Sequence, residues 1–154
     1  MLGKERVVVF GAGNVLLRDE GIGVHVARAL ASLGLPDNIE VIDGGTSSDS
    51  LANLEPAHKL IIVDAVRADG QPGAVYRLSP DDIEGRPGML SLHEAGVSES
   101  LRMMSLLKIE PREVVILGVQ PAEIAWGMEL SEELRRKMPD ILNAVLREIS
   151  GERV

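Results

Sequence analysis

The chain has no cysteine and only three aromatic residues, one each of Phe, Trp and Tyr. The absence of cysteine excludes disulfides, thiolate catalysis and zinc fingers, and it fits a reducing cytosol. The scarcity of aromatic rings means that Val, Ile, Leu, Ala and Met must fill the core. With 154 residues, the chain fits a single domain over positions 1–154, and a domain of this size buries roughly 70% of its unfolded surface.

Basic charge and long apolar runs are also scarce. Asp and Glu number 24 against 16 Lys and Arg, which gives a net charge of −8 at pH 7. Such an acidic chain disfavours nucleic acid and anionic membrane surfaces as partners. No run approaches the ~20 apolar residues of a membrane helix, and no signal peptide is evident. We therefore expect a cytoplasmic protein without a membrane or nucleic-acid partner, and a monomer, because no coiled-coil pattern occurs.

Predicted strands and helices alternate along the chain, which indicates a three-layer α/β/α domain. Strands are predicted over Arg6–Phe10, Ile39–Ile42, Leu60–Val63, Ala74–Leu78 and Glu113–Leu117, and helices over Gly21–Ser32, Ser47–Leu54, Val97–Leu107 and Ser131–Ile149, with a capped turn at Ser79–Ile83. The connection before Ala74 is too short for a parallel crossover, so the fourth strand is predicted to be antiparallel and at an edge. Pro139 is predicted to kink the last helix or to split it in two.

The glycine-rich stretch Gly11–Gly23 joins the first strand to the first helix and carries two adjacent carboxylates, Asp19 and Glu20. Open α/β sheets bind ligands at this edge, beyond the carboxyl ends of their strands. A second glycine turn is predicted at Asp43–Thr46, after the second strand. The stretch therefore marks one edge of the sheet as the place to look for a site.

Glu20, Asp64 and His93 are candidate metal ligands because of their positions. Glu20 follows the first strand, Asp64 ends the third and His93 precedes the helix at Val97–Leu107. Doubly wound sheets commonly place the first and third strands side by side, about 4.8 Å apart. Two carboxylates and an imidazole suit Zn, Ni, Co or Fe, and three protein ligands leave a position for water or substrate. Plainer interpretations stay open. Glu20 could complement the positive end of the first helix, Asp64 could be a turn or cap residue, and His93 could be a surface histidine or a cap.

Two other site types are weighed against this one. Gly11 and Gly13 resemble the start of a dinucleotide motif, but Leu16 stands where its third glycine is needed. A serine hydrolase would need a nucleophilic serine and a base, and the candidates are His93 as base with Ser47, Ser48, Ser91 or Ser98. However, no Gly-x-Ser-x-Gly elbow occurs. His25 and His58 are interpreted as structural or solvated. A phosphate loop is excluded, since Gly-Lys-Ser/Thr is missing.

The motifs taken together resemble the [NiFe]-hydrogenase maturation endopeptidases. The resemblance follows the chain in order from Gly11–Gly23 through Asp43–Thr46, Ile62–Ala65, Pro72-Gly73, Ser91–His93, Leu117–Pro121 and Trp126-Gly127. Each motif alone is weak, but their order and spacing are specific, and they cover residues 6 to 149. The resemblance implies one α/β domain with a twisted, five-stranded, mostly parallel sheet.

The resemblance also implies a function. The family removes a short C-terminal extension from the precursor of the hydrogenase large subunit after nickel insertion. It implies that Glu20, Asp64 and His93 bind the metal, which is nickel presented by the substrate, and that another divalent cation can substitute in a crystal. Asp43 corresponds to a further functional acidic position. The expected enzyme is a nickel-recognising, aspartic-type endopeptidase in which Asp43 or Asp19 serves as base; the alternative is a non-catalytic nickel-binding or docking module for the precursor.

Overall fold

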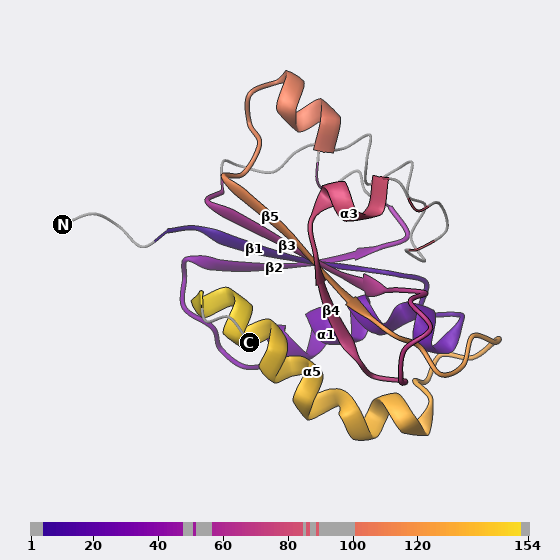
Figure 1. Cartoon of the computed structure of the whole chain (residues 1–154). Helices are drawn as coiled ribbons and strands as arrows, with labels where there is room; N and C mark the ends of the chain where they lie inside the picture. Colours follow the sequence, from indigo (N-terminus) through magenta and orange to yellow (C-terminus); the bar gives the residue numbers. More distant parts are fainter. Residues whose placement is uncertain are drawn as a thin grey trace.

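A twisted sheet of five strands forms the centre of the computed structural model, which describes residues 5–47, 51, 57–84, 86, 89 and 101–151. The strands are β1 (Val7–Ala12), β2 (Ile39–Gly45), β3 (Lys59–Ala65), β4 (Val75–Leu78) and β5 (Glu113–Val119). Their order across the sheet is β2-β1-β3-β5-β4 (Figure 1). Only β4 runs antiparallel, so the predicted antiparallel edge strand and the pairing of the first strand with the third are confirmed.

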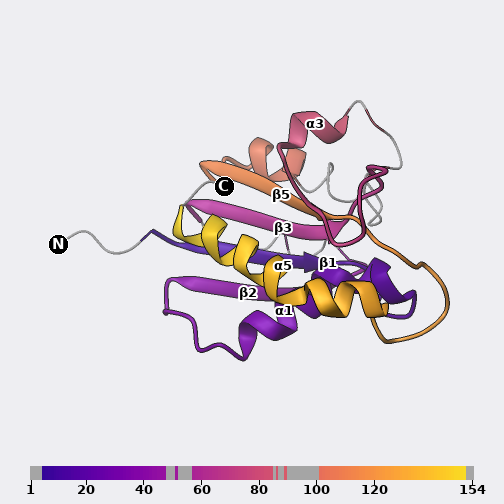
Figure 2. The ribbon, with the colours of Figure 1, turned by 60° about the horizontal axis from the view of Figure 1, so that its bottom comes forward.

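Helices cover both faces of the sheet. On one face lie α1 (Ile22–Ala31) and α5 (Glu132–Ser150), which Figure 2 shows in front of the strands. On the other face lie α3 (Pro80–Glu84) and a helical segment at 101–106 (Figure 1). A short 3-10 helix, η1 (Arg18–Gly21), leads into α1. The structure is thus the three-layer α/β/α domain predicted from the sequence.

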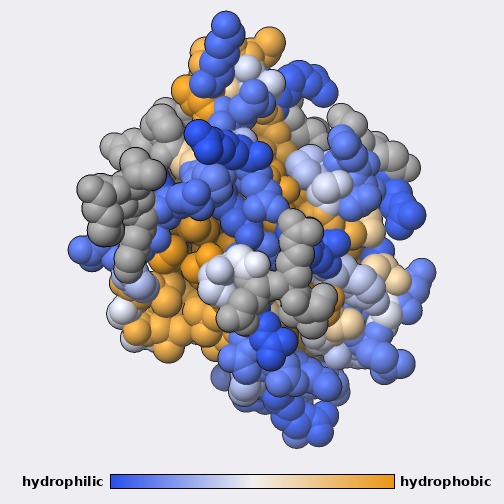
Figure 3. Space-filling view, turned by 60° about the vertical axis from the view of Figure 1, so that its left-hand side comes forward, coloured by the Kyte–Doolittle hydropathy of each residue, from blue (hydrophilic) through white to orange (hydrophobic). Residues whose placement is uncertain are grey.

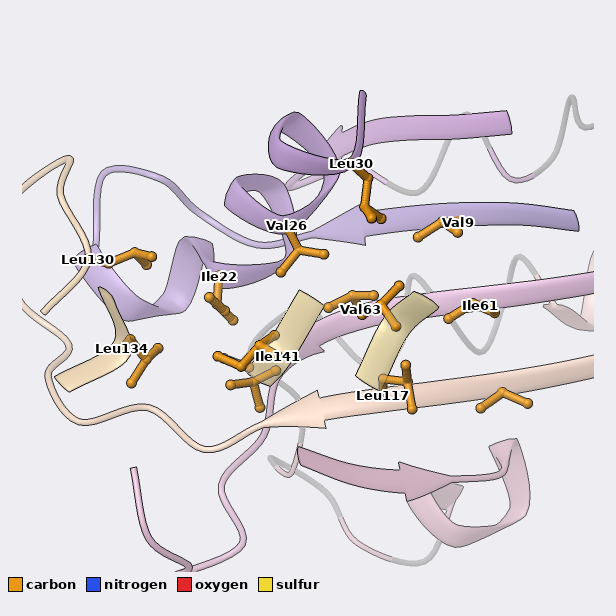
Figure 4. Close-up of a cluster of buried hydrophobic side chains, with 14 of the residues drawn as sticks. Val9, Ile22, Val26, Leu30, Ile61, Val63, Leu117, Leu130, Leu134 and Ile141 are labelled. Atoms are coloured by element: carbon orange, nitrogen blue, oxygen red, sulfur yellow. The ribbon is translucent and has the colours of Figure 1, made fainter. Parts of the chain in front are cut away.

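Two apolar clusters, one on each face, hold the layers together. The cluster under α1 and α5 includes Val9, Val63 and Leu117 from the strands and is shown in Figure 4 with its helical partners. The cluster on the opposite face is formed by the alternate strand residues, among them Phe10 and Ile62. The continuous apolar runs of β1 and β3 follow from this arrangement, because strands covered on both faces have no solvent side. No helix among the described residues is long and apolar enough to span a bilayer.

One predicted element is wrong, and of the two outcomes predicted for Pro139, a kink or a split, the split is excluded. The residues Asp43–Gly45, predicted as a turn, continue β2, which pairs with β1 through a bulge opposite Gly11 and Ala12. Pro139 does not split the last helix, which runs unbroken from Glu132 to Ser150. Its buried residues Leu134, Ile141 and Val145 anchor the turns on both sides of the proline, so packing offsets the lost backbone hydrogen bond.

Other predicted elements lie partly or wholly among residues that the structure does not describe. Of the predicted helix at Ser47–Leu54, positions 47 and 51 are described, and position 51 is helical. The helix predicted at Val97–Leu107 is described from 101 on, where it is helical through 106. The N-cap predicted at Ser131 is confirmed, because its hydroxyl accepts a hydrogen bond from Leu134 N at 3.3 Å.

A buried charge cluster lies at the opposite end of the strands from the glycine-rich stretch. Lys59 Nζ lies 2.5 Å from Glu148 Oε2, and Arg77 Nε lies 2.8 Å from Glu148 Oε1. Burial raises the pKa of Glu148, but hydrogen bonds from Arg77 and Lys59 outweigh burial and hold that pKa below its ordinary value. The folded state therefore favours the carboxylate, and its stabilising contribution is present above the unfolded pKa and is lost as pH falls through the folded value.

We expect the Glu148→Gln variant to lose stability in a pH-dependent way. At pH 7 the change removes the nearer carboxylate partner of buried Lys59 and leaves it only Glu113, at 3.6 Å, which lowers the free energy of unfolding by roughly 3 kcal/mol. Near pH 3, below the ordinary glutamate pKa of about 4.3, the gap between wild type and variant shrinks, because the unfolded wild-type chain takes up a proton at Glu148 that the folded state disfavours. Urea unfolding at the two pH values measures this. The same gap at both values would contradict the assignment, and exposed Glu133→Gln serves as control.

Candidate functional site

The carboxyl ends of β2, β1, β3 and β5 meet at one edge of the sheet. Asp43 of β2 lies opposite Gly11 of β1, which in turn lies opposite Val63 of β3. Asp64, the next residue of β3, pairs with Gly118 of β5. Parallel strands in this register bring residues that are far apart in sequence to a common edge, where open α/β sheets bind their ligands.

Asp64 is fully buried at this edge. One of its carboxylate oxygens accepts a hydrogen bond from the N–H of Ala65 at 2.8 Å. Side chains alternate along a strand, so Asp64 points to the same face as Ile62, the face that carries α3 and the segment 101–106. A buried carboxylate at a strand end is expensive unless something compensates its charge, and a bound cation is one such compensation.

Glu20 lies in η1, directly before α1, and is partly buried. Its carboxylate makes no hydrogen bond or ion pair with any residue of the described segments. Gly13, with φ of 137°, lies so close to Glu20 that an added Cβ would come within 2.1 Å of the Glu20 carbonyl oxygen. Only glycine fits there, and its presence lets the segment that carries Glu20 fold back onto the end of β1.

A second close approach brings α1 onto the strand ends. A Cβ added at Gly23 would lie 2.1 Å from the carbonyl oxygen of Val63 and 2.2 Å from that of Ala12. The first turn of α1 therefore rests directly on β1 and β3. η1 is also in contact with β3, so the strand that carries Asp64 and the helix that carries Glu20 are neighbours.

Asp19, beside Glu20 in the sequence, has a different environment. It is fully buried, and its carboxylate accepts four hydrogen bonds from the segment after β5: from the N–H groups of Ala122 and Glu123 at 2.9 and 2.8 Å, and from the N–H and hydroxyl of Ser131, both at 2.7 Å. These bonds link the glycine-rich stretch to residues more than a hundred positions away. The geometry makes Asp19 a positioning residue that fixes η1, and with it Glu20.

Asp43 lies on the opposite face of the sheet from Asp64. It shares the orientation of Val41, which packs against the cluster under α1 and α5. Its carboxylate is exposed and forms an ion pair with Arg28 of α1, with Oδ2 and Nε 3.3 Å apart. The extension of β2 through Gly45 explains this orientation, which a turn at Asp43 would not have fixed. Asp43 thus lies near the edge but faces away from Asp64.

Gln120 follows β5 and organises the loop after β3, a role that the sequence did not indicate. Its side-chain oxygen accepts hydrogen bonds from Ala68 N at 2.9 Å and Gly70 N at 3.3 Å. Its backbone N–H and C=O bind Ala74 O and Gly73 N at 2.9 and 2.8 Å. The partners are some 50 residues away in the chain, so no local pattern reveals them. Gln120 thereby holds the loop that follows β3, the strand that carries Asp64.

His93 lies outside the described residues, so the structure does not test its predicted role as a ligand. Met89, four positions earlier, is described: its carbonyl accepts a hydrogen bond from Arg67 N, three residues after Asp64, at 2.7 Å. Among the residues that are described, no group of three or more His, Asp or Glu side chains could hold a metal ion.

His25 is confirmed as a residue of α1. Burial and the charge of Arg28 lower its pKa, against a hydrogen bond with the Met128 backbone and the charge of Asp19. The imidazole is therefore neutral at pH 7. The ring lies between α1 and the backbone of Met128 in the segment after β5, in agreement with the interpretation of His25 as structural.

The donors at the edge fit a divalent cation in kind. Glu20 and Asp64 offer carboxylate oxygens from neighbouring elements, and the carboxylate of Glu20 is left without a partner among the described side chains. Oxygen donors combined with one imidazole suit borderline ions such as nickel and zinc. The described residues therefore supply two carboxylates of the predicted donor set, and the third donor, His93, lies outside them.

Comparisons with known proteins all find proteins of hydrogenase maturation. The profile of a family described as hydrogenase maturation protease matches residues 24–148. Among characterised proteins, the chain is 37% identical over 150 residues to the hydrogenase expression/formation protein HupD of Rhodobacter capsulatus, covering 94% of this chain and 71% of that protein. It is 30% identical over 145 residues to the hydrogenase 2 maturation protease of Escherichia coli K12, covering 92% and 88%.

Solved structures of hydrogenase maturation endopeptidases have the same fold as this chain. The fold matches that of the hydrogenase maturating endopeptidase HybD from E. coli with a TM-score of 0.83 at 29% identity, over 95% of this chain and 93% of that one. It also matches the [NiFe] hydrogenase maturation protease HybD from Thermococcus kodakarensis, with a TM-score of 0.77 at 29% identity, over 93% and 98%. The similarity extends over nearly the full length in each case.

Proposed function

The chain belongs to the hydrogenase maturation protease family, and from this premise we propose that it is the endopeptidase that removes the C-terminal extension of a [NiFe]-hydrogenase large-subunit precursor after nickel insertion. The observation that supports the proposal is the contact between η1, which carries Glu20, and β3, which carries Asp64, at the carboxyl edge of a sheet with this family's fold. The nickel is part of the substrate, and the enzyme recognises it there.

Recognition of nickel follows from the donor set. Glu20, Asp64 and His93 complete the coordination of an ion that the precursor already holds. A precursor without nickel has nothing at this position for the carboxylates to bind, so it is held in the wrong place or not at all. The ion thereby reports that insertion is finished and aligns the scissile bond. A metal ion in such a position can also polarise a carbonyl oxygen.

The assignment of a general base rests on the two remaining carboxylates. Asp19 holds four hydrogen-bond donors with its two oxygens, which supports a role in positioning Glu20. Asp43 is exposed and paired with Arg28 on the other face of the sheet. The proposal that either one accepts a proton stays a prediction. An aspartic-type mechanism needs one of them to reach the attacking water.

Nickel-loaded and nickel-free precursors offer the decisive comparison. When each is mixed with the purified protein, we expect only the nickel-loaded precursor to be shortened, because only it offers the ion to Glu20 and Asp64. Mass spectrometry of the precursor measures the loss of the C-terminal peptide. Equal cleavage of both forms would remove nickel as the cue while leaving the peptidase activity in place.

The same experiment separates the enzyme from the alternative function, a non-catalytic docking module. A module would bind the nickel-loaded precursor and leave its mass unchanged over many equivalents of protein and hours of incubation. Turnover, with one molecule of the protein shortening many precursors, is expected only of an enzyme. A stoichiometric complex of uncut precursor would favour the module.

A further inference from the structure

Four exposed apolar side chains surround the segment that carries Glu20. Leu16 comes from the glycine-rich stretch, and Ile124, Trp126 and Met128 come from the segment after β5. Their exposed fractions are 48%, 41%, 82% and 65%. We call these four residues the apolar lip. Scattered apolar residues are normal on a surface, but a group that includes a nearly bare tryptophan marks an interaction site.

Backbone hydrogen bonds fix the lip to the candidate site. The two segments run side by side at the end of α1 (right-hand side of Figures 1 and 2), where Leu17 and Gly127 form a parallel bridge. Gly127 N donates to Leu16 O and Arg18 N donates to Gly127 O, both at 2.9 Å. Glu20 N in turn donates to Leu17 O at 3.2 Å. The lip and Glu20 therefore belong to one hydrogen-bonded unit.

Buried groups hold this unit in place. The carboxylate of Asp19 binds the backbone at both ends of the segment that carries Ile124, Trp126 and Met128, and the ring of His25 in α1 lies near the Met128 backbone. Arg18 adopts φ of 49°, a conformation that costs energy for a residue other than glycine. Such local strain concentrates at functional sites. A buried carboxylate, a histidine and a strained residue thus support a surface whose side chains face solvent.

We propose that the apolar lip docks the folded part of the precursor, not the extension that is cut off. This inference rests on the proposed function, because the lip is continuous with the residue at which the precursor must present its nickel. Trp126 projects from the surface, so it loses contact with water only if the partner supplies a concave pocket. A folded protein has such pockets, whereas an extended peptide does not. Trp and Met are also enriched at the centres of protein interfaces.

Trp126 is the only tryptophan of the chain, which permits a direct test. The protein is labelled with 5-fluorotryptophan and carries Glu20→Gln to prevent cleavage. On addition of nickel-loaded precursor, its single ¹⁹F resonance is expected to shift and to lose its sensitivity to solvent H₂O/D₂O exchange. Addition of a synthetic peptide of the C-terminal extension alone is expected to change neither. A resonance that stays solvent-sensitive at precursor concentrations at which calorimetry shows the labelled variant to be bound would overturn the docking role.

Kinetics give the second readout. Trp126→Ala is expected to raise KM for the nickel-loaded precursor roughly tenfold or more, as loss of an interface anchor does, with kcat unchanged because the substitution removes binding that is uniform along the reaction. Leu106→Ala is the matched control. Leu106 is 72% exposed on the segment 101–106, which lies on the face of the sheet opposite α1 (Figure 1), and apolar and polar side chains mix at the top of Figure 3.

The outcomes separate docking from catalysis. If wild type cleaves the precursor and Trp126→Ala does so with the KM of Leu106→Ala, the docking role fails and the proposed function stands. If no variant cleaves but Trp126→Ala alone weakens binding of the precursor in calorimetry, the docking role stands and the peptidase fails. If the wild type neither binds nor cleaves the precursor, both fail.

Discussion

Replacing Glu20 by Gln is expected to stop processing of the nickel-loaded precursor, with a rate at least roughly a hundredfold below wild type. Even residues that only support a metal ligand typically cost 10–100-fold when changed, and a direct ligand costs more. The amide keeps the size of the carboxylate but removes its charge and weakens its bond to a cation. Mass spectrometry of the precursor over time measures the rate, and calorimetry with Ni²⁺ or nickel-loaded precursor measures binding.

The fold is expected to tolerate this change. The carboxylate of Glu20 has no hydrogen-bond or ion-pair partner among the described residues, so the free energy of unfolding should change by no more than about 0.5 kcal/mol. Asp64→Asn is expected to lose activity as well, but with some loss of stability because Asp64 is buried and hydrogen-bonded. Exposed Glu133→Gln is the control for loss of one negative charge. Normal turnover by Glu20→Gln would refute the assignment of the site.

The sequence was sufficient for the elements whose signals are local. The apolar runs of β1 and β3, the short connection before β4 and the serine at the start of α5 each act within a few residues, and each prediction from them is confirmed. The edge that carries Glu20 and Asp64 was predictable for the same reason. Chain order and parallel pairing suffice to bring the ends of the first and third strands together.

Where the sequence misled, tertiary pairing overrode a local preference. Asp43-Gly44-Gly45 has turn chemistry, yet pairing with β1 extends β2 through it, and the strand then turns Asp43 toward Arg28. Pro139 disfavours helix at its own position, but burial of Leu134 and Ile141 on either side maintains the helix. Both outcomes depend on partners that only the folded chain supplies.

The supports of the site could not have been predicted at all. The partners of Asp19 are 103 to 112 residues away, and Gln120 binds a loop some 50 residues earlier. An aspartate that follows a glycine loop looks the same in sequence whether it binds a metal, accepts a proton or caps a distant segment. The side-chain hydrogen bonds of the folded protein show that Asp19 caps a distant segment, while its role as a base stays a prediction.

Removing the carboxylate of Asp19 has the largest expected effect on stability. In Asp19→Ala, three backbone N–H groups and the hydroxyl of Ser131 lose their acceptor, the two groups of Ser131 in a buried place and the N–H groups of Ala122 and Glu123 in a partly buried one. Each unsatisfied buried group costs about 1–3 kcal/mol, so a loss of roughly 4 kcal/mol or more is expected, a large part of the 5–15 kcal/mol that stabilises an ordinary domain. Urea unfolding followed by circular dichroism measures the loss.

Asp19→Asn keeps the test informative if the alanine variant does not fold. Both carboxylate oxygens accept N–H groups, so an amide must point its own N–H₂ at a donor in either orientation, and an intermediate loss is expected. Asp43→Asn is the matched control, because its carboxylate is exposed and forms one surface ion pair, worth at most about 1 kcal/mol. Hydrogen exchange localises the effect: protection at Ala122, Glu123 and Ser131 should fall in the Asp19 variants and stay in Asp43→Asn. Equal stability of Asp19→Asn and Asp43→Asn would contradict the stabilising role of the four hydrogen bonds to Asp19. It would also contradict the support that these bonds are proposed to give to Glu20 and the apolar lip.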